Sequence, residues 1–214
     1  MSGYRITDIL DLKETIAAEL FEGLTWPWEA LPGIKDFILK LGPTLDPGVF
    51  EKRGEGIWIA KSAKVFESAY IGGPCIIDEE AEIRHCAFIR GSAIVGKGAV
   101  VGNSTELKNA VLFNKAQSPH YNYIGDSILG YKAHTGAGVI ASNLKSDKKN
   151  IVVHTPEGDK ETGLRKFGAI LGDLADVGCG SVLNPGTVIG RNSRVYPLSA
   201  VIDCWLSVGV TVLF

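Results

Sequence analysis

Residues 59–101 decide the fold, and they read IAKSAKVFESAYIGGPCIIDEEAEIRHCAFIRGSAIVGKGAVV. An aliphatic side chain recurs at every sixth position of this stretch, and a small residue follows each one four positions later. A period of six fits neither an α-helix nor an alternating strand. It is typical of a solenoid of very short strands, in which every sixth side chain points inward. The aliphatic series is Ile59, Val65, Ile71, Ile77, Ile83, Ile89, Val95 and Val101.

The six-residue pattern continues to Leu107, returns at 129–141 and again at 171–201, and is broken twice. The first break lies near 114–128, where the register slips by one residue. The second break, at about 142–170, is polar and charged, and its length predicts a projecting hairpin or arm.

The chain therefore divides into three expected parts. Residues 1–56 carry apolar side chains at helical spacing, and we expect a helical cap that shields an open end of the solenoid. We expect residues 57–203 to form the solenoid, with the insertion near 142–170, and residues 204–214 to form a C-terminal tail.

The composition excludes several classes of protein. Hydrophobic residues make up 45% and charged residues 21% of the 214 residues, which is typical of an ordered globular chain. Lys and Arg number 22 against 24 Asp and Glu, so no basic footprint for nucleic acid or an anionic membrane exists. No apolar run approaches the ~18 residues of a membrane span, and the N-terminus lacks a signal-peptide pattern. We expect a cytoplasmic protein.

Two basic residues fall on one side of the expected solenoid. Arg90 and Lys108 each follow an inward aliphatic residue and are 18 positions apart, which places them on successive coils about 4.8 Å apart. Stacked cations repel each other unless an anion lies between them, and a phosphate fits because Arg can bind it through two hydrogen bonds. Alternatively, the two are solvated and neutralised by Glu106. The spacing alone leaves both interpretations open.

A histidine opens the first break. His120 lies 12 residues after Lys108, two hexapeptides further, and hence on a neighbouring face at nearly the same level. A lone histidine is more often a surface residue than a catalyst. An imidazole with a pKa near neutrality can nevertheless serve as general base for an amine that attacks a thioester.

These motifs resemble the acetyltransferase domain of the bifunctional N-acetylglucosamine-1-phosphate uridyltransferase/glucosamine-1-phosphate acetyltransferases. They resemble even more closely the archaeal sugar-1-phosphate nucleotidylyltransferase/acetyltransferases. The resemblance covers about residues 57–203 and rests on the spacing Arg-x17-Lys-x11-His-x2-Tyr followed by Asn-x5-Lys. It implies a left-handed parallel β-helix of hexapeptide repeats that assembles as a homotrimer with active sites between subunits.

The resemblance also implies a reaction and its residues. Acetyl-CoA would donate its acetyl group to the amine of an amino-sugar phosphate similar to glucosamine-1-phosphate, on the way to nucleotide sugars such as UDP-N-acetylglucosamine. The implied catalytic base is His120. The implied substrate-binding residues are Arg90, Lys108, Tyr123, Asn143 and Lys149, and Ala137 and Cys179 fall where acetyl-CoA is held.

No metal is needed for this chemistry. A γ-type carbonic anhydrase on the same scaffold would need three histidines that converge on zinc. The sequence has four histidines, none of them in an H-x4-H pair, and its cysteines form no C-x-x-C pair. We therefore expect no metal site.

The chain departs from the family pattern in several places. Residues 1–56 replace the nucleotidyltransferase domain, and Cys179 stands where bacterial members have a serine. His134 replaces an asparagine, and it fits a surface residue as well as a second acid–base group. The apolar C-terminus, DCWLSVGVTVLF, lacks the basic tail that helps to hold coenzyme A. These departures leave a second hypothesis: a non-catalytic sugar-phosphate or sugar-nucleotide binding module that partners a separate nucleotidyltransferase.

Overall fold

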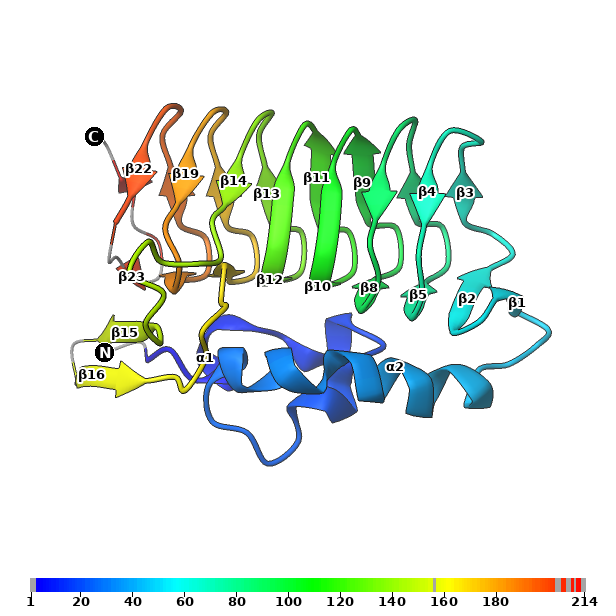
Figure 1. The fold of residues 1–214 in the computed structure, drawn as a ribbon, viewed down its shortest axis with the longest axis horizontal. Coiled ribbons are helices and arrows are strands. Elements are labelled where there is room, and N and C mark those ends of the chain that lie inside the picture. Colours follow the sequence, from blue (N-terminus) through cyan, green and yellow to red (C-terminus); the bar gives the residue numbers. More distant parts are fainter. Residues whose placement is uncertain (1–2, 156, 203–204, 207–208, 210, 213–214) are drawn as a thin grey trace.

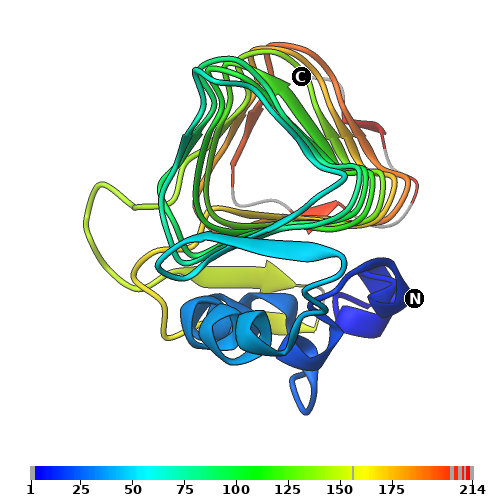
Figure 2. The ribbon, with the colours of Figure 1, turned by 90° about the vertical axis from the view of Figure 1, so that its right-hand side faces the viewer.

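The computed structural model describes residues 3–155, 157–202, 205–206, 209 and 211–212. Short parallel strands wind into a solenoid of about eight turns with a triangular cross-section (Figure 2). The N-terminal segment and a hairpin run along one side of it (Figure 1). No helix in this described part of the chain is long and apolar enough to cross a membrane. The expected tail, 204–214, lies largely outside the described residues.

Each turn contributes strands to three faces. The covered face carries β2 (Ile57–Ala60), β5 (Cys75–Ile77), β8 (Ala93–Val95), the second halves of β10 (Glu106–Leu112) and β12 (Tyr123–Leu129), β17 (Ala169–Leu171), β20 (Thr187–Ile189) and β23 (Trp205–Leu206). The site face carries β4 (Tyr70–Ile71), β7 (Phe88–Ile89), the first halves of β10 and β12, β14 (Ile140–Ala141), β19 (Val182–Leu183) and β22 (Ala200–Val201). The third face carries β3 (Lys64–Val65), β6 (Glu82–Ile83), β9 (Val100–Asn103), β11 (Gln117–His120), β13 (His134–Thr135), β18 (Asp176–Val177), β21 (Arg194–Val195) and β24 (Thr211–Val212).

The interior of the solenoid is filled as the six-residue period predicts. The inward aliphatic residues from Ile77 onward are buried, and small residues such as Ala81 and Ala99 pack between them. Val65 and Ile71, in the first turn, are only partly buried. The solenoid prediction is confirmed, and the first turn keeps a partly open end.

The register slips at two corners between the site face and the covered face. Between β7 and β8 this corner has three residues, whereas the matching corner inside β10 and inside β12 has only two. Each of β10 and β12 therefore continues around the bend as one strand. The shortened corners are Lys108–Asn109 and Gly125–Asp126. The sequence suggested a slip near 114–128; the second corner lies there, and the first comes earlier.

The N-terminal segment, residues 3–49, is helical only in part. Its α-helices are α1 (Ile6–Ile9) and α2 (Ile34–Leu41), and its 3-10 turns are η1 (Leu12–Glu14), η2 (Ala18–Phe21), η3 (Pro27–Gly33) and η4 (Gly42–Thr44). The segment lies along the covered face rather than over an open end, because the outward residues of that face are apolar. Each buried Ile or Val there contributes roughly 1.5–3 kcal/mol. The joint core includes Trp28, Ile34, Ile38, Ile76, Ile94, Val111, Ile128 and Ile170.

Two hairpins complete the fold. β1 (Phe50–Gly54) pairs antiparallel with β2 and covers the first edge of the covered face. The second break in the repeat contains an antiparallel hairpin of β15 (Val152–Thr155) and β16 (Gly158–Glu161). This arm packs on the N-terminal segment, where Lys160 Nζ lies 5.6 Å from the centre of the Trp26 ring.

Candidate functional site

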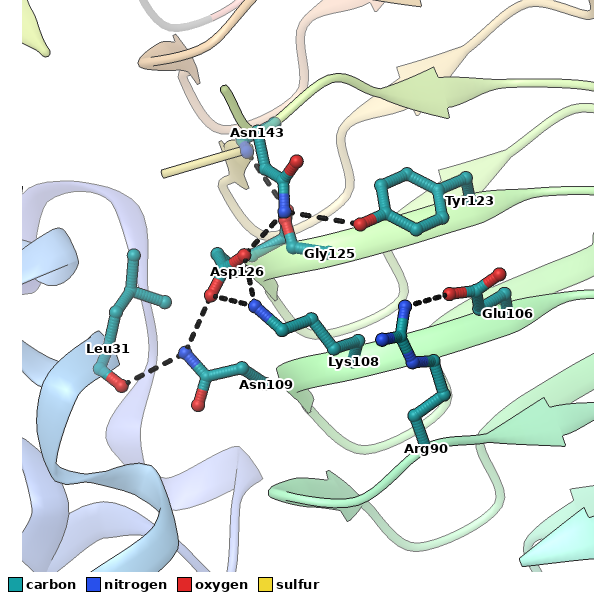
Figure 3. Close-up of polar contacts among 11 residues, drawn as sticks. Leu31, Arg90, Glu106, Lys108, Asn109, Tyr123, Gly125, Asp126 and Asn143 are labelled. Carbon is teal, nitrogen blue, oxygen red and sulfur yellow. Dashed lines mark hydrogen bonds and ion pairs between the residues drawn. The ribbon is translucent and has the colours of Figure 1, made fainter. Parts of the chain in front are cut away.

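A polar cluster surrounds Asp126 at the two shortened corners (Figure 3). Lys108 Nζ donates to both carboxylate oxygens of Asp126, at 2.9 and 2.8 Å. Asn109 Nδ2 donates to Oδ1 at 3.1 Å, and Asn143 Nδ2 donates to Oδ2. The Asp126 side chain is only 6% exposed, against 26% for Lys108. A buried carboxylate thus organises two of the expected substrate-binding residues.

Tyr123 and Arg90 extend this cluster over the site face. The Tyr123 hydroxyl accepts a hydrogen bond from Asn143 Nδ2 at 3.1 Å. Burial raises the pKa of Tyr123, and the nearby carboxylates of Glu106 and Asp126 raise it further. Arg90 Nη1 donates to Glu106 Oε1 at 2.8 Å, and this hydrogen bond and the carboxylate charge raise the pKa of Arg90. Each of the two expected phosphate-binding cations therefore has a carboxylate partner within the chain.

Local backbone requirements explain why these residue types stand at the corners. Asn109 and Asp126 have φ values of 51° and 49°, the left-handed region that Asn and Asp adopt more easily than most residues. Register pairs Lys108 with Gly125. A Cβ at Gly125 would lie 2.5 Å from the Tyr123 hydroxyl, so glycine leaves room for the phenol.

His120 lies at the opposite end of the same side of the solenoid. It ends β11 and is exposed, and no hydrogen bond or ion pair of its imidazole is found within the described ranges. Its backbone N–H donates to Asn122 Oδ1 at 3.2 Å. Asn122 is 3% exposed and donates through Nδ2 to Thr135 Oγ1 and the Gly136 carbonyl, both at 2.8 Å. This satisfied amide fixes the backbone that carries His120.

The residues expected to hold acetyl-CoA share an edge with His120. The Gly138 N–H donates to the His120 carbonyl, and the Gly180 N–H donates to the Ala137 carbonyl one turn later. Cys179 and Ala137 are both exposed along this edge. Between this edge and the Asp126 cluster run six residues of chain, at most about 20 Å. The structure therefore groups the expected residues at two ends of the site face.

Two expected residues lie apart from both groups. Lys149 is exposed in the loop before the arm, and its backbone N–H donates to Asp147 Oδ1 at 3.0 Å. His134 lies on the third face, with Nδ1 2.8 Å from Asp176 Oδ1. Within the described ranges, no group of three or more His, Cys, Asp or Glu could hold a metal ion.

The sequence prediction missed Asp126 and Asn109 as members of the site. A signal for them does exist: the inward series runs from Leu107 to Leu112 and from Ile124 to Leu129, two spacings of five among spacings of six. A shortened repeat marks a tight corner, and corner residues of a regular scaffold often carry function.

Comparisons with known proteins agree with the expected family. The family model described as the GMPPB C-terminal domain matches residues 71–155. The bifunctional protein GlmU of Methanococcus aeolicus is 36% identical over 150 residues, which cover 62% of this chain and 36% of that protein. A bifunctional sugar-1-phosphate nucleotidylyltransferase/acetyltransferase of Sulfurisphaera tokodaii is 32% identical over 151 residues, 62% of this chain and 38% of that protein. The chain thus spans well under half the length of these bifunctional relatives.

A relative of more similar size is a putative uncharacterized acetyltransferase, YaiX, of Escherichia coli K12. It is 32% identical over 152 residues, which cover 71% of this chain and 66% of that protein. Among solved structures, the acetyltransferase domain of PglB from Neisseria gonorrhoeae aligns over 73% of this chain and 53% of its own at 15% identity, with a TM-score of only 0.32. The six-residue period, although broken twice, and these sequence relatives together support the resemblance to the hexapeptide-repeat acyltransferases.

Proposed function

We propose that this protein transfers an acetyl group from acetyl-CoA to the amine of a phosphorylated amino sugar, similar to glucosamine-1-phosphate, in nucleotide-sugar biosynthesis. The observation that carries the proposal is the Asp126 cluster, which gathers Lys108, Tyr123 and Asn143 beside Arg90. These groups suit a sugar phosphate, because cations bind the phosphate while amide and phenol groups bind ring hydroxyls.

In the proposed complex the sugar lies on the site face. Arg90 donates one guanidinium N–H group to Glu106, and its other N–H groups bind phosphate oxygens. Lys108 contributes a second positive charge. Lys149, which lies apart in the loop before the arm, is the third cation expected to approach the phosphate. Tyr123 and Asn143 orient the sugar ring, since their hydrogen bond to each other fixes both polar groups.

His120 is the general base of the proposed reaction. An imidazole nitrogen takes the proton from the amine as the amine nitrogen attacks the thioester carbonyl of acetyl-CoA. The tetrahedral intermediate then collapses to the amide, and the coenzyme A thiolate leaves and receives a proton. Ala137 and Cys179 lie along the same edge as His120 and would flank the bound thioester.

A homotrimer of left-handed β-helices, with each active site between two subunits, completes the proposal. Within one chain His120 and the Asp126 cluster lie at two ends of the site face, so a neighbouring subunit can close the site between them. The outward side of that face carries exposed apolar side chains suited to such a contact. Tyr70 is 62% exposed and Ile140 43%, and the rings of Tyr70 and Phe88 meet edge to face at 5.5 Å.

The substitution Phe88→Glu should therefore dissociate the assembly. The mass by light scattering should fall from three times 22.9 kDa toward a single chain, because the charge would be buried at the contact. Leu174→Glu is the matched control, since Leu174 is comparably exposed, at 46%, away from the site face. A monomeric parent protein, or a trimer that survives Phe88→Glu, would contradict the proposed interface.

Replacement of Arg90 by Met should raise the acceptor KM by roughly 10-fold or more, because charge-assisted hydrogen bonds to phosphate contribute about 1.5–3 kcal/mol. The rise should appear with a phosphorylated amino sugar and be much smaller with the same sugar lacking phosphate. Arg84→Met is a matched control, as Arg84 pairs with Glu82 at 3.0 Å on the third face. Equal effects of the two variants would refute phosphate binding by Arg90.

The proposed function is tested by thiol release from acetyl-CoA with a panel of amino sugars, amino-sugar 1-phosphates and nucleotide-linked amino sugars. Turnover with one acceptor class identifies the substrate. Saturable binding of an amino-sugar phosphate without turnover would instead support the non-catalytic binding module.

A further inference from the structure

We propose that Asp126 is a positioning residue of the acceptor site, and that the N-terminal segment braces it through Leu31. The inference deepens the proposed function and rests on it for its kinetic readout. Asp126 holds the two groups expected to meet the sugar phosphate, and its own oxygens are fully used inside the protein.

The hydrogen bonds of Asp126 indicate that it positions other side chains rather than contacting the substrate. A carboxylate has about four lone-pair sites. Asp126 accepts four hydrogen bonds: two from Lys108, one from Asn109 and one from Asn143. With its side chain 6% exposed and its oxygens saturated, Asp126 offers nothing to a substrate directly. Its effect on the acceptor must therefore pass through Lys108 and Asn143.

The two partners depend on Asp126 in different ways. Lys108 has a long flexible side chain, and the bidentate contact with Asp126 holds its ammonium at one place over the corner. Asn143 Nδ2 divides its hydrogen bonds between Asp126 and the Tyr123 hydroxyl, so the carboxylate also orients the phenol. One buried group thus sets the geometry of three expected substrate contacts.

The N-terminal segment reaches this network at Leu31. Asn109 Nδ2 donates both to Asp126 Oδ1 and, at 3.2 Å, to the carbonyl of Leu31 in η3 (Figure 3). Leu31 is 2% exposed and packed in the joint core of the covered face. The family resemblance begins only at about residue 57, so this brace belongs to a part of the chain outside it.

The decisive variant is Asp126→Asn, which keeps the size but replaces one acceptor oxygen with an NH2 group facing other donors. The acceptor KM should rise by about 10-fold or more, the scale of a lost charge-assisted hydrogen bond. The acetyl-CoA KM and the pH dependence of kcat should stay unchanged, because His120 lies at the other end of the face. Asn109→Gly, which retains a residue tolerant of positive φ, should raise the acceptor KM by about 3-fold.

Asp173→Asn is the matched control. The Asp173 side chain is 7% exposed, close to the 6% of Asp126. It pairs with Arg191 at 2.9 Å and accepts hydrogen bonds from the Asp11 and Tyr131 N–H groups at 2.8 Å. It therefore ties down the same N-terminal segment at a point away from the Asp126 cluster. This variant should lower the melting temperature and leave the acceptor KM unchanged.

The outcomes separate this inference from the proposed function. An acceptor KM that is unchanged in Asp126→Asn, or that rises equally in Asp173→Asn, would overturn the positioning role. An unchanged KM in Asn109→Gly would overturn the brace. If the parent protein shows no turnover, the proposed function fails, and calorimetry with glucosamine-1-phosphate decides the inference: about 10-fold weaker binding by Asp126→Asn supports it, and equal binding overturns it.

Discussion

Replacement of His120 by alanine is expected to lower kcat for acetyl transfer by about 10²–10⁴-fold, the usual contribution of a general base. The acceptor KM should change little, because the Asp126 cluster lies at the other end of the site face. The fold should tolerate the change, since the side chain is exposed and Asn122 holds the backbone rather than the ring. Thiol release at saturating acetyl-CoA and acceptor would test this expected loss of kcat.

His154→Ala provides the matched control. His154 is also exposed, and its Nδ1 lies 2.7 Å from Asp159 Oδ1 within the arm, away from His120. Its removal should leave kcat near the parent value. A His120→Ala enzyme that turns over at the parent rate would remove His120 from the mechanism, whatever the acceptor.

The solenoid could be predicted from the sequence because its determinant is local and repeated. Most six-residue units bury one aliphatic side chain, so the same constraint recurs along the chain and a chance match is excluded. The position of the N-terminal segment could not be predicted in this way. Its place depends on the outward residues of the covered face, such as Ile94 and Ile128, and the six-residue period says nothing about outward positions.

The site, too, could be predicted from the sequence only in part. The pairing of Arg90 and Lys108 on successive coils follows from spacing, whereas their individual carboxylate partners depend on side-chain rotamers and on two shortened corners. The five-residue spacing marks the corner that holds Asp126, but its hydrogen bonds with Lys108, Asn109 and Asn143 form only in the folded chain. In this chain, both deviations of one residue from the period fall at the corners that carry the Asp126 cluster.

The second large effect is expected for Gly102→Ala. Gly102 lies in β9 between Val101, which pairs with Ser118, and Asn103, which pairs with His120. It therefore faces Pro119 of β11, and a Cβ at this position would overlap the Pro119 backbone. Backbone cannot give way as a flexible side chain can, so the strands must separate. We expect a loss of about 3 kcal/mol in the free energy of unfolding, and a fall of roughly 6–12 °C in melting temperature.

Gly33→Ala separates this clash from a general cost of adding a methyl group. Gly33 precedes α2 with φ of −85°, and its added Cβ would lie 3.3 Å from a methyl group at the end of the Leu20 side chain, so the melting temperature should hardly change.

Because Pro119 immediately precedes His120, the displaced strand also carries the proposed base with it. Misplacement of a reacting group by about 1 Å can cost 10²-fold in rate. Folded Gly102→Ala protein, assayed well below its melting temperature, should therefore show a reduced kcat with a nearly normal acceptor KM. A melting temperature and kcat equal to those of Gly33→Ala would contradict the close approach of β9 and β11, and with it the link between the repeat and the placement of His120.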